Sequence, residues 1–458
     1  MEQQIIAELK RLIGSQYVMD QLEDRICYSF DATFRDFPPD VVVKPGSVED
    51  IVAIVKMARQ YNIPVTARGA ATGLSGGSVP VKGGISLVLT RLNKIIEIDK
   101  ANRVAVVETG VITEDFVTAV NQAGLFYPPD PASAKTSTMG GNIAECAGGP
   151  RGVKYGITRD YVLGLEVVLP DGSVVEVGNK FDGEMAGPDW SMLLVGSEGT
   201  LGIVTKAYLK LVDKPSAKQT LLAIFNTLDD AANTVSEMIA SGTIPTTLEI
   251  MDNLTIRAVE DYLKVGLPVN AEAILLIEVD GSAAAIAKQA EHVMKVCKKC
   301  GAIEIQAAST PDDIDKLWRA RRAISPACGK INPTKISEDA TVPRSQIPAM
   351  VRRLREIAKK YNLKMVIFGH AGDGNLHPNI LSNKHDHEEM ERVEQAVEEL
   401  FKAALDLGGT LSGEHGIGYM KAPFLKWETG ETGFAAGQKL KNVIDEQGLL
   451  NPGKLFNA

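Results

Sequence analysis

Three glycine-rich segments constrain this chain more than any other feature. They lie at residues 69–77, 138–149 and 196–202, and each lies close to a segment that we predict to be a strand. Glycine allows left-handed backbone angles and close approach by other groups, and successive backbone amides can form a concave anion site. One such segment is commonly only a turn. Three of them in one stretch of chain favour a single long ligand, and a dinucleotide with a pyrophosphate at its middle has a suitable length.

Two common phosphate-binding motifs and one hydrolase motif do not account for these segments. The chain contains no Walker A sequence, and no predicted strand leads into a helix through Gly-x-Gly-x-x-Gly. Residues 73–77 match the Gly-x-Ser-x-Gly nucleophile elbow, which requires a helix directly after the serine. Gly76, Gly77 and Pro80 disfavour a helix at that point. The segments therefore favour a backbone cradle over a serine hydrolase.

Composition excludes several classes of protein. The 458 residues carry 49 Lys and Arg against 58 Asp and Glu, for a net charge of −9, and 45% of them are hydrophobic. This balance predicts a globular protein and argues against both nucleic-acid binding and a polybasic membrane anchor. No apolar run approaches the roughly 20 residues of a membrane span. Five scattered cysteines do not form a disulfide framework, so we expect a cytoplasmic protein.

The residue pattern predicts an α+β protein of four parts. Residues 1–36 look helical, beginning with an amphipathic helix, and residues 37–214 contain short strands with the glycine segments between them. Residues 215–420 alternate longer strands and helices, which predicts an antiparallel sheet with helices on one face. Residues 421–458 end in turn residues, and we expect them to return to the first domain.

Two histidines flank a turn signal. His370 and His377 lie on either side of Asp373-Gly374, a dipeptide typical of two-residue hairpin loops. If these two residues form the loop, position 370 pairs with 377 and the two imidazoles oppose each other on one face. The residues alone leave two interpretations open, a pair of structural histidines at a hairpin base or a pair of metal ligands.

The motif at residues 412–418, Ser-Gly-Glu-His-Gly-Ile-Gly, favours the metal. Glu414 would complete a His₂Glu set that leaves a coordination position open, and His415 would remain as a base. Zinc, iron and manganese all accept such ligands, so the identity of the metal stays open. We expect the other three histidines to be surface groups: His292, His385 and His387.

Several motifs together resemble a known family. The segments 68–77, 130–142 and 196–202 resemble the FAD domain of vanillyl-alcohol-oxidase-type flavoproteins. The chain from about residue 38 to 456 looks like the branch that contains glycolate oxidase subunits and D-lactate dehydrogenases. The resemblance implies a two-part FAD-binding domain and an α+β substrate (cap) domain with an antiparallel sheet.

The resemblance also implies a set of FAD-binding residues. Residues 69–78 would wrap the pyrophosphate with backbone amides, and Asn451 would reach the flavin from the tail. Some relatives bind FAD covalently through a histidine where this chain has Thr72, so we expect dissociable FAD. The full expected set is Arg68, Gly69, Ala70, Ala71, Thr72, Gly73, Ser75, Gly76, Gly77, Ser78, Pro131, Thr138, Gly141, Asn142, Gly148, Ile203 and Asn451.

In the resembled branch, the positions that match His370, His377 and Glu414 bind a divalent metal, and the position that matches His415 acts in catalysis. Arg321 matches an arginine that holds the substrate carboxylate, a role that suits a bidentate guanidinium. Lys335 lies near a substrate-contacting lysine of some relatives, although the spacing differs. Cys297 and Cys300 form a lone Cys-x-x-Cys on a predicted helix, too few ligands for a zinc or iron–sulfur site, and we expect them to be structural.

The implied activity is oxidation of a small D-2-hydroxy acid by hydride transfer to FAD, with D-lactate as the first candidate and glycolate the second. The chain shows no motif for a second redox centre, so an electron-accepting partner is expected, such as an electron-transfer flavoprotein or an iron–sulfur subunit. The glycolate oxidase subunit of a larger complex is the close alternative. From other classes, a metal-dependent hydrolase using the His₂Glu set and a flavin-binding subunit without catalysis stay open.

Overall fold

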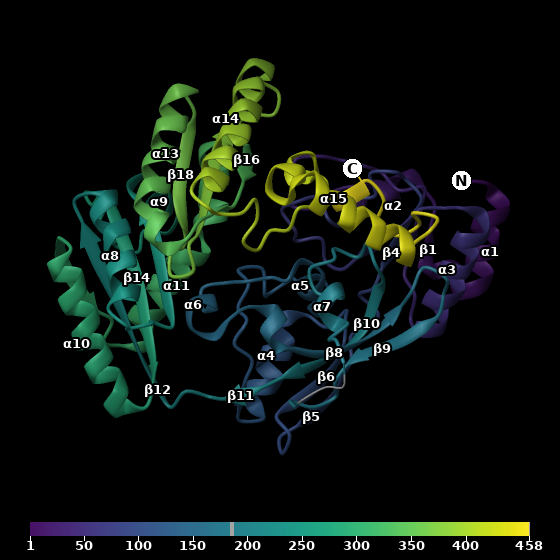
Figure 1. The fold of residues 1–458 in the computed structure, drawn as a ribbon, viewed down its shortest axis with the longest axis horizontal. Coiled ribbons are helices and arrows are strands. Elements are labelled where there is room, and N and C mark those ends of the chain that lie inside the picture. Colours follow the sequence, from purple (N-terminus) through teal and green to yellow (C-terminus); the bar gives the residue numbers. More distant parts are fainter. Residues whose placement is uncertain (184–186, 458) are drawn as a thin grey trace. The chain divides into compact units, whose positions relative to one another are not determined.

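The computed structural model describes residues 1–183 and 187–457, and they form two compact units. Figure 1 shows the elements of both. The first unit contains three stretches of chain, and the second contains a short stretch and a long one. The first comprises Met1–Ala147, Ile157–Lys214 and Glu414–Ala458, and the second Gly148–Gly156 and Pro215–Gly413. Among the described residues, no helix combines the length and the apolar character that a bilayer crossing requires.

The first unit contains two main sheets. The smaller has the strand order β1-β2-β4-β3, with β2, β3 and β4 parallel to one another and β1 antiparallel to β2. Ser47 begins the helix between β2 and β3, because its hydroxyl accepts the Asp50 N–H. The elements are α1 (Gln3–Ile13), β1 (Val18–Met19), α2 (Leu22–Cys27), β2 (Val41–Val43), α3 (Val48–Tyr61), β3 (Val65–Arg68) and β4 (Ile85–Val88).

The second sheet of this unit is antiparallel, in the order β5-β6-β10-β8-β9, and α4, α5 and α7 cover one face of it. The C-terminal helix α15 leads into a tail in which Leu450 pairs with Val65. The elements are β5 (Ile95–Asp99), β6 (Val104–Glu108), α4 (Thr113–Gln122), β7 (Leu125–Phe126), α5 (Met139–Glu145), β8 (Val162–Val168), β9 (Val174–Gly178), α7 (Ser191–Leu194), β10 (Ile203–Lys210), β11 (Val212–Asp213) and α15 (Leu425–Ile444).

The second unit is built on one antiparallel sheet in the order β15-β12-β14-β13-β18-β19-β16, with β17 paired to β19. Its elements are α6 (Gly152–Tyr155), β12 (Ala217–Phe225), α8 (Leu228–Ala240), β13 (Thr247–Asp252), α9 (Asn253–Leu263), β14 (Ala273–Gly281), α10 (Ala283–Lys299), β15 (Ala302–Ala307), α11 (Pro311–Arg322), α12 (Ile324–Ile331), β16 (Thr334–Ser337), β17 (Ala340–Thr341), α13 (Ile347–Lys360), β18 (Lys364–His370), β19 (Asn375–Ser382) and α14 (His387–Asp406).

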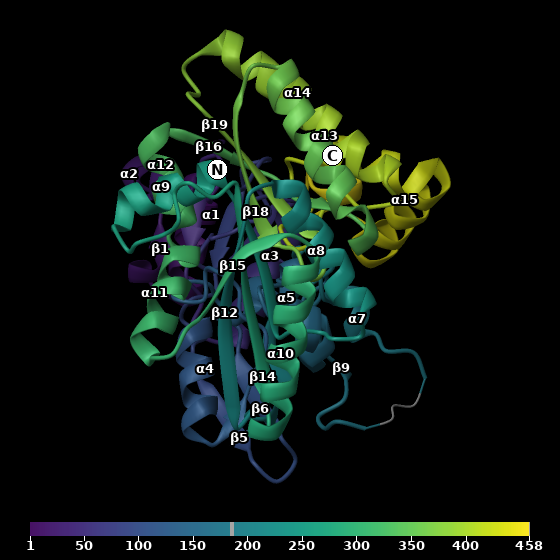
Figure 2. The ribbon, with the colours of Figure 1, turned by 90° about the vertical axis from the view of Figure 1, so that its left-hand side faces the viewer.

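Two expectations about these elements were wrong. Helices cover both faces of the large sheet, since α9, α11 and α12 share a core with one face while α8, α10 and α13 pack on the other (Figure 2). Because both faces are covered, consecutive residues of β12, β13 and β14 are buried. An uninterrupted apolar run of this kind in the sequence does not show whether helices cover one face of the sheet or both. The first 36 residues are not all helical, because β1 pairs with β2 through a contact that local pattern cannot reveal.

Candidate active site

The glycine-rich loop at residues 69–78 is held by its carbonyl groups. The carbonyl of Gly73 accepts the Ala32 N–H at 3.1 Å, and that of Ser75 accepts the N–H groups of Tyr419 and Met420 at 3.0 Å each. None of the backbone N–H groups of residues 69–78 is hydrogen-bonded to another described residue. A run of bare amides is the arrangement that binds an anion, so the loop fits the pyrophosphate of a dinucleotide.

The tail of the chain fixes this loop from behind. The buried ammonium of Lys454 donates to the carbonyls of Gly77 and Val79, both at 2.6 Å, and to Asn451 Oδ1 at 2.7 Å. The Asn451 amide donates to the carbonyls of Gly77 at 2.8 Å and Glu198 at 2.6 Å. Because the two ends of a trans peptide point in opposite directions, a held Gly77 carbonyl directs the Ser78 N–H the other way.

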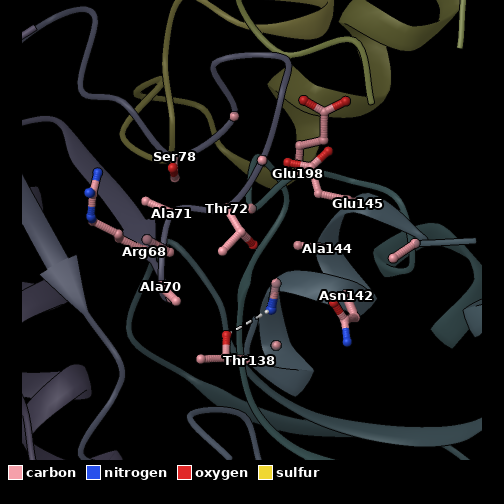
Figure 3. Close-up of a pocket in the computed structure, with 18 of the residues that line it drawn as sticks. Arg68, Ala70, Ala71, Thr72, Ser78, Thr138, Asn142, Ala144, Glu145 and Glu198 are labelled. Atoms are coloured by element: carbon pink, nitrogen blue, oxygen red, sulfur yellow. Dashed lines mark hydrogen bonds between the residues drawn. The ribbon is translucent and has the colours of Figure 1, made fainter. Parts of the chain in front are cut away.

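These segments line one pocket of the first unit, which we call the glycine pocket (Figure 3). Most of the expected FAD-binding residues line it, including Thr138, whose hydroxyl accepts the Gly141 N–H at 3.3 Å. Ser75, Gly76 and Asn451 are not among the lining residues, and Gly148 belongs to the second unit. The expected residues that line it are Arg68, Gly69, Ala70, Ala71, Thr72, Gly73, Gly77, Ser78, Pro131, Thr138, Gly141, Asn142 and Ile203.

Two glutamates of the glycine pocket were missed at the level of sequence. Glu198 accepts the N–H groups of Ile417 at 2.7 Å and Gly418 at 2.6 Å. Glu145 Oε2 is buried without a hydrogen-bond partner, and burial, with the neighbouring Glu198 charge, raises the pKa of Glu145 well above its ordinary value. Both lie inside glycine-rich segments of the sequence, Glu145 in 138–149 and Glu198 in 196–202, and an acidic residue at such a place was the signal that could have identified them.

In the second unit, the two histidines share one face of the large sheet, although the predicted register was wrong. His370 pairs with Asn375 and His377 with Phe368, so the imidazoles are diagonal neighbours. The loop has four residues because the N–H of Gly374 reaches back to the carbonyl of residue 371 at 3.2 Å. The ring centroids are still 5.0 Å apart, and a ring nitrogen of each lies within 4.8 Å of one of the other.

Each histidine is bonded to a fully buried carboxylate. His370 Nδ1 lies 2.7 Å from Glu249 Oε1, and His377 Nδ1 lies 3.3 Å from Asp339 Oδ1. A carboxylate at Nδ1 holds the proton there and leaves the Nε2 lone pair for a metal, the arrangement found behind metal-bound histidines. The donor set therefore fits a divalent metal. Neither acid was predicted, although Glu249 is a charged residue between the apolar Leu248 and Ile250 of strand β13.

Arg321 lies beside this pair, on the same side of the sheet. Its Nε donates to Glu249 Oε2 at 2.5 Å, and the Phe368 ring lies 5.1 Å from its Cζ. Its two terminal nitrogens donate no hydrogen bond to any described residue, and the residue is only 6% exposed. A buried guanidinium whose two terminal nitrogens bond no other described residue suits a carboxylate ligand. We call His370, His377, Glu249, Asp339 and Arg321 the histidine site.

The remaining candidates differ in their surroundings. Lys335 donates to Ser325 Oγ at 2.7 Å, and burial lowers the pKa of Lys335. Burial raises the pKa of Cys297 to about 12, so this thiol stays protonated, as expected of a structural residue. Cys300 is also a free thiol.

Glu414 and His415 belong to the first unit and line the glycine pocket. They follow Gly413 directly, and the Gly413 N–H donates to Asp339 Oδ2 at 3.0 Å within the second unit. Asp339 of the histidine site therefore binds the residue that directly precedes Glu414 in the sequence. That Glu414 completes the metal set and His415 acts as a base stays a prediction.

Comparisons with known proteins agree with this description. Residues 214–455 match the model of the C-terminal domain of FAD-linked oxidases, and residues 39–178 match an FAD-binding domain. The glycolate oxidase subunit GlcD of Bacillus subtilis is 47% identical over 98% of this chain and 96% of its own length. A D-lactate dehydrogenase of Anaerostipes hadrus is 35% identical, over 98% of this chain and 95% of its own length.

Solved structures show the same fold at low identity. A p-cresol methylhydroxylase aligns with a TM-score of 0.83 at 18% identity, over 99% of this chain and 96% of its own. A 4-ethylphenol oxidase from Gulosibacter chungangensis aligns with a TM-score of 0.82 at 21% identity, over 98% and 96%. At these identities the likeness concerns the fold alone, an FAD-binding part followed by a cap with an antiparallel sheet.

Proposed function

Because the chain belongs to the family of FAD-linked oxidases, we propose that it oxidises a small D-2-hydroxy acid, D-lactate first and glycolate second. The two substrates correspond to the names of its relatives, a D-lactate dehydrogenase and a glycolate oxidase subunit. The FAD-linked oxidoreductase character derives from the family, and the choice of substrate is our proposal.

The observation that carries the proposal is the histidine site. Three groups lie on one side of a sheet. Two are imidazoles, each with a buried carboxylate at Nδ1, and the third is a buried guanidinium whose terminal nitrogens bond no other described residue. A 2-hydroxy acid presents a hydroxyl and a carboxylate on adjacent carbons, and these groups match a metal and an arginine respectively.

Each of the implicated residues has a separate part in the proposed reaction. Arg321 binds the substrate carboxylate and orients Cα. His370, His377 and Glu414 would hold a divalent metal, which would lower the pKa of the substrate hydroxyl. His415 accepts the hydroxyl proton on an imidazole nitrogen. The glycine pocket would hold FAD non-covalently, and FAD would supply the acceptor for the hydride from Cα.

The electrons must then leave the protein. The sequence has no motif for a second redox centre, so we propose an electron-accepting partner, either an electron-transfer flavoprotein or an iron–sulfur subunit. The similarity to GlcD, itself named as a subunit, supports a role within a larger complex as the alternative.

Anaerobic titration with D-lactate, L-lactate and glycolate tests the proposal. The flavin absorbance of the purified holoprotein should bleach with D-lactate or glycolate and persist with L-lactate. His415→Ala should abolish bleaching and retain bound FAD, whereas His387→Ala, at the exposed start of α14, should bleach normally. A flavin that none of these acids reduces would contradict the proposed function.

A further inference from the structure

Glu249 lies on β13, a central strand of the second unit's sheet, and its side chain is fully buried. Its partner across the strand pair is His370 on β18. A carboxylate at such a position is unfavourable unless it is paired and hydrogen-bonded, so its partners indicate why the chain retains it.

The two carboxylate oxygens of Glu249 bind two different groups. Oε1 lies 2.7 Å from His370 Nδ1, and Oε2 accepts the Nε–H of Arg321 at 2.5 Å. One side chain thus connects the residue expected to bind the metal with the residue expected to bind the substrate carboxylate.

Both bonds use the atoms that the expected ligands do not need. The bond to Nδ1 leaves Nε2 of His370 for a metal, and the bond to Nε leaves the two terminal nitrogens of Arg321 for a carboxylate. The same carboxylate therefore sets the orientation of both groups and the spacing between them.

We propose that Glu249 is a positioning residue that fixes the spacing between Arg321 and His370, so that the site prefers a carboxylate and a hydroxyl on adjacent carbon atoms. A 3-hydroxy acid places one more carbon between these two groups and fits this fixed spacing poorly. The inference rests on the proposed function and deepens it, because it assigns the 2-hydroxy preference to one buried side chain.

Glu249→Gln tests the inference in the holoprotein. Glutamine has one acceptor oxygen and a donor amide, so it cannot accept from both His370 Nδ1–H and Arg321 Nε–H. We expect a roughly 10- to 100-fold weaker Zn²⁺ affinity, the usual effect of losing such a supporting bond, measured by chelator competition after metal depletion. The KM for D-lactate should rise about 10-fold, and the kcat/KM preference for D-lactate over D-3-hydroxybutyrate should narrow, with FAD content unchanged.

Glu278→Gln is the matched control. Glu278 is a buried glutamate of the same sheet, but its partners are Lys218, Thr220 and Trp318. It should lower the thermal midpoint and leave Zn²⁺ affinity and substrate preference within about two-fold. Wild-type values in Glu249→Gln, or equal losses in both variants, overturn the inference.

A second variant keeps the test informative if the first is too unstable to purify. Glu249→Asp retains the charge and shortens the reach by one methylene, so it should keep one of the two bonds and still narrow the substrate preference. The wild-type protein separates the two proposals. If neither D-lactate nor glycolate reduces its flavin, the proposed function fails, whereas normal wild-type behaviour with an unaltered Glu249→Gln refutes only the role of Glu249.

Discussion

The glycine pocket of the first unit and the histidine site of the second are made from different parts of the polypeptide. The pocket is made largely of backbone, with bare N–H groups on one side of a loop and carbonyls held by Lys454 and Asn451 on the other. The histidine site is made of side chains, three of them on the neighbouring strands β13, β18 and β19, and each imidazole is bonded to a buried acid.

Two glutamates with buried carboxylate oxygens, one in each site, differ in pKa because of this contrast. Burial and the Glu198 charge raise the pKa of Glu145 in the glycine pocket, where its Oε2 has no partner. Burial acts in the same direction on Glu249, but the Arg321 charge and the hydrogen bonds donated by His370 and Arg321 outweigh it, so the pKa of Glu249 is lowered. In the histidine site both carboxylate oxygens of Glu249 are hydrogen-bonded to other residues of the site. In the glycine pocket Glu145 Oε2 is left unpaired, as expected where a large ligand is to bind.

The largest effect is expected from removing one imidazole. His377→Ala should release the metal and lower kcat/KM with D-lactate by on the order of 10³-fold, because metal polarisation supplies several kcal/mol. FAD binding should be unchanged, since the glycine pocket is made by the other unit. Metal analysis, flavin absorbance and steady-state rates measure the three quantities, with His387→Ala as control. Full turnover in a metal-free variant would contradict the proposed site.

The glycine pocket should bind FAD more weakly when the lysine that holds its loop carbonyls is replaced. Lys454→Met keeps the apolar stem and removes donors to the carbonyls of Gly77 and Val79, so the loop amides lose their fixed direction. Hydrogen bonds to a charged group contribute about 1.5–3 kcal/mol, which corresponds to roughly 10- to 100-fold weaker FAD binding. Titration of apoprotein with FAD measures the change, and Lys439→Met, exposed on α15, is the control. An unchanged Kd would mean that the loop holds its shape unaided.

The same comparison explains how much could be predicted from sequence. The glycine pocket was accessible because glycine clusters mark the positions where backbone must approach a ligand. The strands and helices from 217 to 299 and the long helix near 387–406 were predictable from periodicity, which depends on burial of one helix face or strand run. The C-terminal anchor Lys454 was not expected to be buried, because its partners are backbone carbonyls 377 and 375 residues away, at Gly77 and Val79.

The histidine site was predicted only in part. His370 and His377 stand out because the chain has six histidines, and their turn signal indicated proximity. The register was wrong because the dipeptide Asp373-Gly374 occupies the last two positions of a four-residue loop, a choice that depends on tertiary contacts. Glu249 lies on another strand, β13, and Asp339 lies between β16 and β17, so no local pattern connects them with the histidines.

A smaller effect is expected from closing space in the glycine pocket. The backbone of Gly77 is not in the left-handed region, so alanine can adopt it, but the added Cβ would overlap with Glu145 Oε1. Gly77→Ala should weaken FAD binding about 10-fold, within the 1–3 kcal/mol of typical overpacking. Glu145→Ala in the same chain should restore most of the affinity, a coupling that a double-mutant cycle measures. Gly329→Ala, whose Cβ meets nothing within 4 Å, should have no effect. Additive losses would show that the overlap is not the cause.

The smallest effect concerns the pH dependence of stability of the apoprotein. Glu145 faces Glu198, Asp31, Lys454 and Lys421, and with burial as the largest cause its pKa lies above the ordinary 4.5. An acid with a raised folded pKa binds more protons when folded, so the stability it contributes is present below pH 4.5 and is lost as pH rises toward the folded pKa. Glu145→Gln removes this loss, so its thermal midpoint should increasingly exceed that of the wild type between pH 5 and pH 8, by about 2–4 °C for each kcal/mol. Glu114→Gln, exposed on α4, controls for net charge. Parallel pH profiles for Glu145→Gln and the wild type would mean that the carboxyl of the glycine pocket is as well compensated as Glu249, and the contrast between the two sites would not hold.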